Sequence, residues 1–232
     1  MSSKFIRAED GQIHIVFTSQ EAHVLINLTE QILELLGDGA VNSEIDIDPI
    51  FQMMGLGSSM DMGGSEQPPE DPVLRRLLPN AYKDEKSASE FRRYTEHGLR
   101  EKKRAHALTV YEALIPQDED WNADQPIDRG SIEIKFIDND AMAWLGALND
   151  LRLALAVRLG ISKEFNEGSS PIGETNLDFQ PKSDSSDLHK KYELMTESDP
   201  MKAVYAVYSW LGWLQQTLLE LLMSSGDDHQ AT

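Results

Sequence analysis

Cysteine is absent from the 232 residues of this sequence. These residues therefore form no disulfide, supply no thiolate nucleophile and hold no iron–sulfur cluster. The same absence excludes a redox switch based on thiol oxidation within them.

Basic residues are scarce, with 21 Lys and Arg against 40 Asp and Glu, for a formal net charge of −19. A field of this sign repels nucleic acid and anionic membranes at long range and favours basic protein partners. The first twelve residues lack the apolar core of a signal peptide. The longest apolar run, 203–223, contains Gln215, Gln216 and Glu220, which indicates a core helix rather than a membrane span. We therefore expect a cytoplasmic protein without membrane attachment.

Motifs for catalysis and for cofactor binding are also missing. The six histidines are scattered, and none forms the one-turn pair typical of a zinc helix. The sequence has no Walker loop, no GxGxxG and no GxSxG elbow. We assign no catalytic, cofactor-binding or metal-binding residue, expect no cofactor, and predict that the chain is not an enzyme. An uncharacterised metal-free enzyme, with a site assembled from distant residues, is kept as a further alternative.

The most apolar stretch, 131–160, predicts a strand followed by a long helix. Ile132, Ile134 and Phe136 alternate with charged residues, as in a strand with one buried face. Asp138 or Asp140 is expected to cap the helix, and Gly160 to end it. The helix has apolar positions on two sides, which predicts packing neighbours on both.

An imperfect copy of this unit lies near the N-terminus. Sliding the chain by 119 residues places GQIHIVFTSQEA on GSIEIKFIDNDA, Leu25 on Trp144 and Leu33 on Arg152. One interpretation is a pseudo-repeat whose two strands share a small sheet. The other is that any strand followed by an amphipathic helix aligns this well, and two copies do not make a solenoid.

Four positions on the second helix are predicted to be buried polar or structural residues: Trp144, Asn149, Asp150 and Arg152. Arg152 lies inside the apolar arc, so its permanently charged guanidinium needs a carboxylate or carbonyl partner if it is buried. A structural ion pair or a side chain reaching to solvent is the favoured interpretation, and contact with a ligand is the alternative.

The predicted fold class is mainly α (α+β): a helical domain with a small sheet from two pseudo-repeated βα units, about 11–37 and 130–160. We expect a single domain over 1–226, with a mobile acidic loop at about 38–70 and a polar loop at about 162–186. Residues 227–232 are expected to be a disordered tail. Asp71-Pro72 starts a further short helix, and Asp199-Pro200 starts the last one.

Positive charge is concentrated between residues 75 and 104, which hold ten of the 21 basic residues. Most lie on a predicted helix, Ser87–Ile115, where five project into about a third of the circumference and are our candidate partner-binding residues: Arg92, Arg93, Arg100, Lys103 and Arg104. One interpretation is a solvated face that exchanges ion pairs with the acidic loop. The other is a docking face for an acidic partner or a nucleic-acid backbone. No aromatic residues interleave with this basic face, so direct nucleic-acid binding is the less favoured alternative.

Four segments carry a family resemblance: EDPVLRRLLPNAY at 70–82, SASEFRRYTEHGLREKKRAHA at 87–107, AWLGALNDLRLALAVRLGI at 143–161 and SWLGWLQQTLLELL at 209–222. Together they resemble the actinobacterial AosR-like family of oxidative-stress transcriptional regulators, formerly a domain of unknown function. The resemblance implies a cytoplasmic regulatory protein that acts by protein–protein contact, with a stress sigma factor as the candidate partner. Regulation through cysteines is not carried over, because this member has none. The resemblance leaves the oligomeric state open.

Overall fold

The structure is a computed structural model that describes residues 3–37, 67–115, 130–160, 192–193, 195–196 and 199–227. Most of the predicted acidic loop (38–66), the predicted polar loop (162–186) and residues 228–232 of the predicted tail lie outside this range. Residue 227, which was assigned to the tail, is the last residue of a helix.

The sheet has three antiparallel strands in the order β1-β2-β3: β1 (Ile6–Arg7), β2 (Ile13–Thr18) and β3 (Ser131–Phe136). A turn joins β1 to β2, and Gly11 adopts a φ of 81° in it, a conformation that glycine takes without strain. The alternation in the sequence is reproduced, because Ile13, Ile15 and Phe17 are buried while the residues between them are more exposed.

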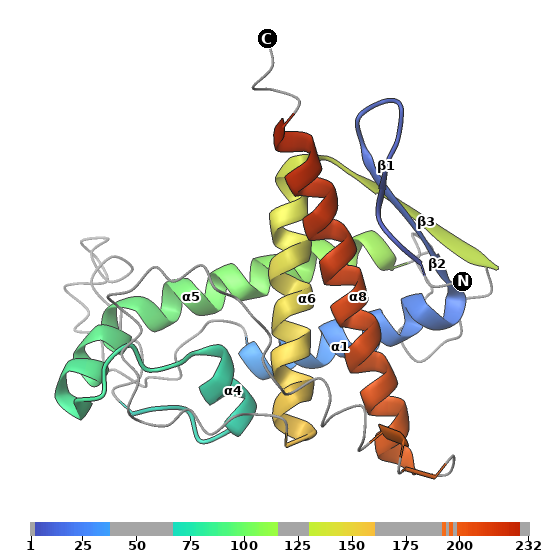
Figure 1. Cartoon of the computed structure of the whole chain (residues 1–232). Helices are drawn as coiled ribbons and strands as arrows, with labels where there is room; N and C mark the ends of the chain where they lie inside the picture. The colour runs from blue at the N-terminus through green and yellow to red at the C-terminus, as the bar shows by residue number, and fades with distance from the viewer. Residues whose placement is uncertain are drawn as a thin grey trace.

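The described part of the chain also forms the helices α1 (Ser19–Leu36), α4 (Pro72–Leu77), α5 (Glu85–Leu114), α6 (Asp138–Arg158) and α8 (Pro200–Asp227). Figure 1 shows α6 and α8 side by side and antiparallel, with α5 and α1 crossing behind them. The predicted class, mainly helical with a small sheet, is confirmed. No helix in the described part of the chain is both long and apolar enough to cross a bilayer.

The two βα units are related by a local two-fold arrangement. Ile15 pairs with Ile134, which is its own equivalent in the repeat, while Ile13 pairs with Phe136 and Phe17 with Ile132. The helices match as well, because equivalent positions are buried in both units: Ala22 and Ala141, Leu25 and Trp144, Ile32 and Leu151, Leu36 and Leu155. The similarity between the units therefore extends to their pairing and packing.

The two units begin their helices differently. Thr18 caps α1 in a capping box, in which its hydroxyl accepts from Glu21 N and the Glu21 carboxylate accepts from Thr18 N. The predicted Asp cap of α6 is wrong: the N-cap is Ile137, with no side-chain hydrogen bond.

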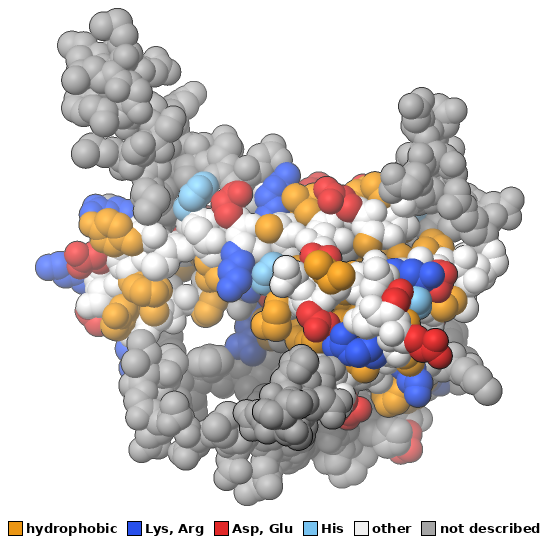
Figure 2. Space-filling view, turned by 90° about the horizontal axis from the view of Figure 1, so that it is seen from above, with side chains coloured by type: hydrophobic (Ala, Val, Ile, Leu, Met, Phe, Trp, Pro, Cys, Tyr) orange, Lys and Arg blue, Asp and Glu red, His pale blue; other side chains and the backbone are white. Residues whose placement is uncertain are grey.

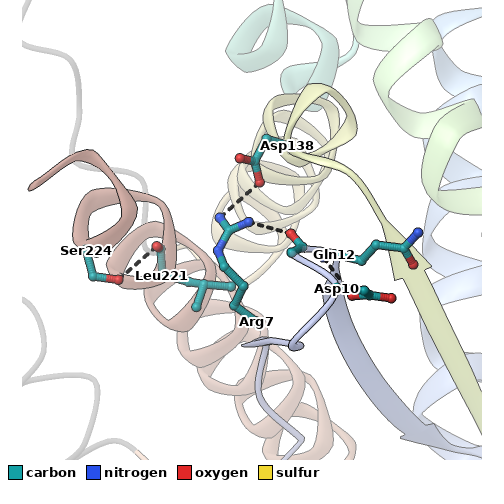
Figure 3. A network of polar contacts seen from close by, with 7 residues as sticks. Arg7, Asp10, Gln12, Asp138, Leu221 and Ser224 are labelled. Carbon is teal, nitrogen blue, oxygen red and sulfur yellow. Dashed lines mark hydrogen bonds and ion pairs between the residues drawn. The ribbon is translucent and has the colours of Figure 1, made fainter. Parts of the chain in front are cut away.

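Asp138 is instead paired with the hairpin. The Arg7 guanidinium lies 3.0 Å from Asp138 Oδ1 and donates to Gly11 O at 2.7 Å, which ties the β1–β2 turn to the start of α6 (Figure 3). The carboxylate still lies in the first turn of α6, where the helix dipole favours negative charge.

An aromatic cluster fills the space between the sheet and α6. Trp144 is fully buried, stacks on Phe136 with ring centroids 5.2 Å apart, and lies parallel to Phe17 at 6.4 Å. Phe5 meets the edges of both Phe136 and Trp144 at 5.9 Å. Because Phe5 precedes β1, the cluster joins all three strands to α6.

Candidate partner-binding surface on α5

The helix α5 carries the predicted binding residues and packs against both α1 and α6. Its N-cap is Asp84, whose carboxylate accepts from Ser87 N at 2.8 Å and from the Ser87 hydroxyl at 2.5 Å. These hydrogen bonds from Ser87 lower the pKa of Asp84. Near the other end, burial raises the pKa of the Tyr111 hydroxyl, and Glu30 on α1 adds to that effect.

Two of the predicted binding residues hold the end of α1. Arg100 donates to Leu36 O at 2.9 Å and to Glu96 Oε1 at 2.8 Å, and Arg104 donates to Gly37 O at 2.9 Å. The last carbonyls of a helix have no partner within the helix and lie at the negative end of its dipole. The two guanidinium groups therefore supply hydrogen-bond donors to the carbonyl oxygens of Leu36 and Gly37 at the C-terminal end of α1.

A third predicted residue joins α5 to α6. Lys103 Nζ lies 2.6 Å from Asp150 Oδ1, and the two side chains are only 15% and 4% exposed. Because this charge-assisted contact is short and largely shielded from solvent, it fixes the position of α5 relative to α6 at this point.

The remaining two residues lie near the start of α5. Arg92 is buried, with 6% exposure, whereas Arg93 is exposed, donates to Tyr94 Oη at 2.7 Å and lies 4.9 Å from the centre of that ring. The expectation of one continuous exposed basic face is thus corrected, because four of its five members are at least partly buried by internal packing. In Figure 2, Lys and Arg side chains are scattered among acidic and hydrophobic ones. Partner binding by these five residues stays a prediction.

A pocket of about 240 Å³ lies between α5 and the segment that follows α4. Its lining is mainly apolar and includes Leu78, Ala88 and Leu99. Beside it are three exposed aromatic side chains, Tyr82 (46%), Phe91 (41%) and Tyr94 (56%), and the rings of Tyr82 and Phe91 meet edge to face at 5.6 Å. We refer to Tyr82, Phe91, Arg93 and Tyr94 as the aromatic–arginine patch. The sequence offers one signal for this patch, because the spacing of Phe91 and Tyr94 puts both rings on one helix face.

The α6 residues singled out in the sequence are placed as follows. Trp144 and Asp150 are buried as expected, but Asn149 is exposed, so its prediction as a buried residue is wrong. Arg152 is partly buried and points to α8, where it donates to Gln215 Oε1 at 2.5 Å and lies 5.1 Å from the Tyr208 ring centre. Its partner is a neutral amide oxygen rather than a carboxylate, and the contact is structural.

Gly146 of α6 lies directly against His106 of α5. A Cβ at this position would lie 2.1 Å from His106 Nδ1, so only glycine admits the imidazole without a shift. Burial lowers the pKa of His106, the nearby Lys102 and Lys103 lower it further, and Asp150 opposes them.

The His106 imidazole predicts a dependence of stability on pH. Because its pKa is below the usual value of about 6.5, the unfolded chain binds the proton more readily than the folded chain. Neutral His106 therefore stabilises the folded chain fully above a pH of about 6.5, and this stabilisation decreases as the pH falls below that value. The free energy of unfolding, measured by urea unfolding at several pH values from 7 to 5, should decrease less with falling pH for His106→Gln than for the wild type. An equal decrease in both proteins would contradict the prediction.

Comparison with known proteins identifies relatives along nearly the whole chain. It is 28% identical over 229 residues to the proteins named oxidative stress regulator AosR in Mycobacterium tuberculosis and Mycobacterium bovis, covering 96% of this chain and 88% of theirs. A protein of Mycobacterium leprae, named putative oxidative stress regulator AosR, is 27% identical over 232 residues, covering 94% and 86%. No solved structure matches. The model of the family described as domain of unknown function DUF2017 matches residues 2–222, and the chain therefore belongs to that family.

Proposed function

We propose that this chain is a regulatory protein of the oxidative-stress response that acts by contact with another protein, with a stress sigma factor as the candidate partner. The observation that carries the proposal is the similarity over 96% of the chain to proteins named oxidative stress regulator. A match of that extent is too long to depend on one shared motif.

The aromatic–arginine patch is the contact surface in this proposal. Aromatic and arginine side chains are enriched at the centres of protein interfaces and contribute most of the binding energy there. The three exposed aromatic rings leave apolar area in water unless something covers it. The adjoining apolar pocket offers a place for an apolar side chain of the partner.

In this proposal, any signal carried by thiol oxidation enters from outside these 232 residues. They contain no cysteine, so the chemistry of thiol oxidation belongs to a partner or to another step of the pathway. The role of this chain is then to bind and to hold a partner.

Capture from lysate tests the proposal. The tagged chain, exposed to lysate of peroxide-treated cells of its own species, should recover a component of the transcription machinery. The double variant Arg93→Glu/Tyr94→Ala should recover at least tenfold less, because it removes two side chains of the patch. The variant Asn149→Ala, at an exposed position on α6, is the matched control.

The two parts of the proposal fail separately. Recovery of no transcription component by the wild type would overturn the function. Equal recovery by the wild type and the double variant would overturn the assignment of the surface, and the function would stand.

A further inference from the structure

The outer edge of β3 has no strand beside it in the described part of the chain. β3 is the last strand in the order β1-β2-β3, and all six of its residues pair with β2 on one side only. A strand edge of this kind presents N–H and C=O groups that can pair with another strand.

The sequence of β3 is complementary to itself. Glu133 and Lys135 flank Ile134, and both charged side chains lie on the exposed face of the sheet, with 52% and 47% exposure. When two copies of this strand run antiparallel with Ile134 opposite Ile134, each Glu133 lies opposite a Lys135. Opposite charges directly across a strand pair stabilise the pairing.

We propose that β3 pairs with β3 of a second copy of this chain, antiparallel and centred on Ile134, to give a continuous six-stranded sheet across a two-fold axis. Ile132 then lies opposite Phe136, so the apolar inner faces of the two sheets join. Ile137, now 52% exposed, lies opposite Ser131 and is partly covered. A closed two-fold contact of this kind uses the same surface on both subunits.

The charges select this register against its alternatives. Parallel pairing in register places Glu133 on Glu133 and Lys135 on Lys135, which is destabilising. A shift of one residue turns the apolar face of one strand toward solvent. Glu133 and Lys135 thus favour the antiparallel register centred on Ile134 and disfavour other pairings of the β3 edge.

The dimer is a weak one. Two strands of six residues bury less surface than the ~1,200 Å² of a standard stable interface, which sets the expected dissociation constant at roughly 10–500 μM. The net charge of −19 on each copy also repels the other. At ~0.15 M salt this repulsion is screened beyond about 8 Å. The contacts at the strand edge therefore determine the affinity of the dimer.

A charge-exchange series tests the proposal by sedimentation velocity from 10 μM to 1 mM. The single variants Glu133→Lys and Lys135→Glu place like charges opposite each other and should raise the dissociation constant at least tenfold. The double variant Glu133→Lys/Lys135→Glu restores opposite charges and should return it to within about threefold of the wild type. Since both side chains are about half exposed, thermal unfolding of all variants should stay close to that of the wild type.

Disulfide trapping tests the register, because the natural chain has no cysteine to interfere. Under mild oxidation, Glu133→Cys mixed with Lys135→Cys should crosslink mainly between the two variants. Directly opposed residues bring their Cβ atoms to about 5 Å, whereas identical residues lie on a diagonal about 7–8 Å apart. Tags of different length on the two variants distinguish the products.

Three results would overturn the inference: a wild type that stays monomeric at 1 mM, a double variant as weak as the single variants, or equal crosslinking within and between the variants. None of these bears on the proposed regulatory function, which depends on a different surface.

Discussion

Replacing Trp144 with alanine is expected to lower the free energy of unfolding by about 3–5 kcal/mol, as for other large buried aromatic side chains. Trp144 is 0% exposed and contacts Phe5, Phe17 and Phe136, so its removal leaves a cavity between the sheet and α6. Urea unfolding followed by circular dichroism measures the loss.

The control for this variant is Met142→Ala on the same helix. Met142 is 65% exposed, and its truncation should change the free energy of unfolding by no more than about 0.5 kcal/mol. A loss of less than about 1 kcal/mol for Trp144→Ala would mean that the aromatic cluster does not hold α6 on the sheet.

Replacing Asp150 with alanine is expected to lower the free energy of unfolding by about 3 kcal/mol, because it leaves the Lys103 ammonium without its partner in a poorly hydrated seam. The value is at the lower end of the usual range, since the Lys103 side chain keeps 15% exposure and reaches water more easily than a fully buried charge. Urea unfolding of the single and double variants measures the effect.

The informative comparison is Lys103→Met/Asp150→Leu, which removes both charges and retains apolar volume. It should be more stable than Asp150→Ala, because most of the single-variant loss comes from the stranded charge rather than from the missing ion pair. A double variant no more stable than Asp150→Ala would contradict this account, and a double variant less stable than the wild type would mean that the ion pair contributes net stability relative to apolar side chains.

Local patterns in the sequence predicted the elements well. Alternation located β2 and β3, and the Asp71-Pro72 pair placed the start of α4, where Asp71 Oδ1 accepts from Val73 N at 2.7 Å. The long basic helix was expected at Ser87–Ile115 and is found at Glu85–Leu114. These features depend on contacts within a few residues, which a sequence displays directly.

The errors concern contacts between distant segments. Asp138 was expected to cap α6, but Arg7, 131 residues earlier, holds its carboxylate. The basic residues of α5 were placed on a solvent face because a helical projection does not contain the C-terminus of α1, which accepts hydrogen bonds from Arg100 and Arg104. The carbonyl partner expected for Arg152 is present, but it is the side-chain amide oxygen of Gln215, 63 residues later, which the sequence alone does not identify.

The pairing of β2 with β3 also determines when the N-terminal unit can reach its final packing during synthesis. β2 leaves the ribosome on the order of ten seconds before β3 has been made, at the usual rates of translation. Until then β2 lacks β3 beside it, and the face formed by Ile13, Ile15 and Phe17 lacks Trp144. Trp213 Nε1, which donates to Ser3 O at 3.0 Å, arrives later still. The first unit to emerge is therefore among the last to complete its packing, and its apolar strand keeps part of its buried surface exposed until the second unit arrives.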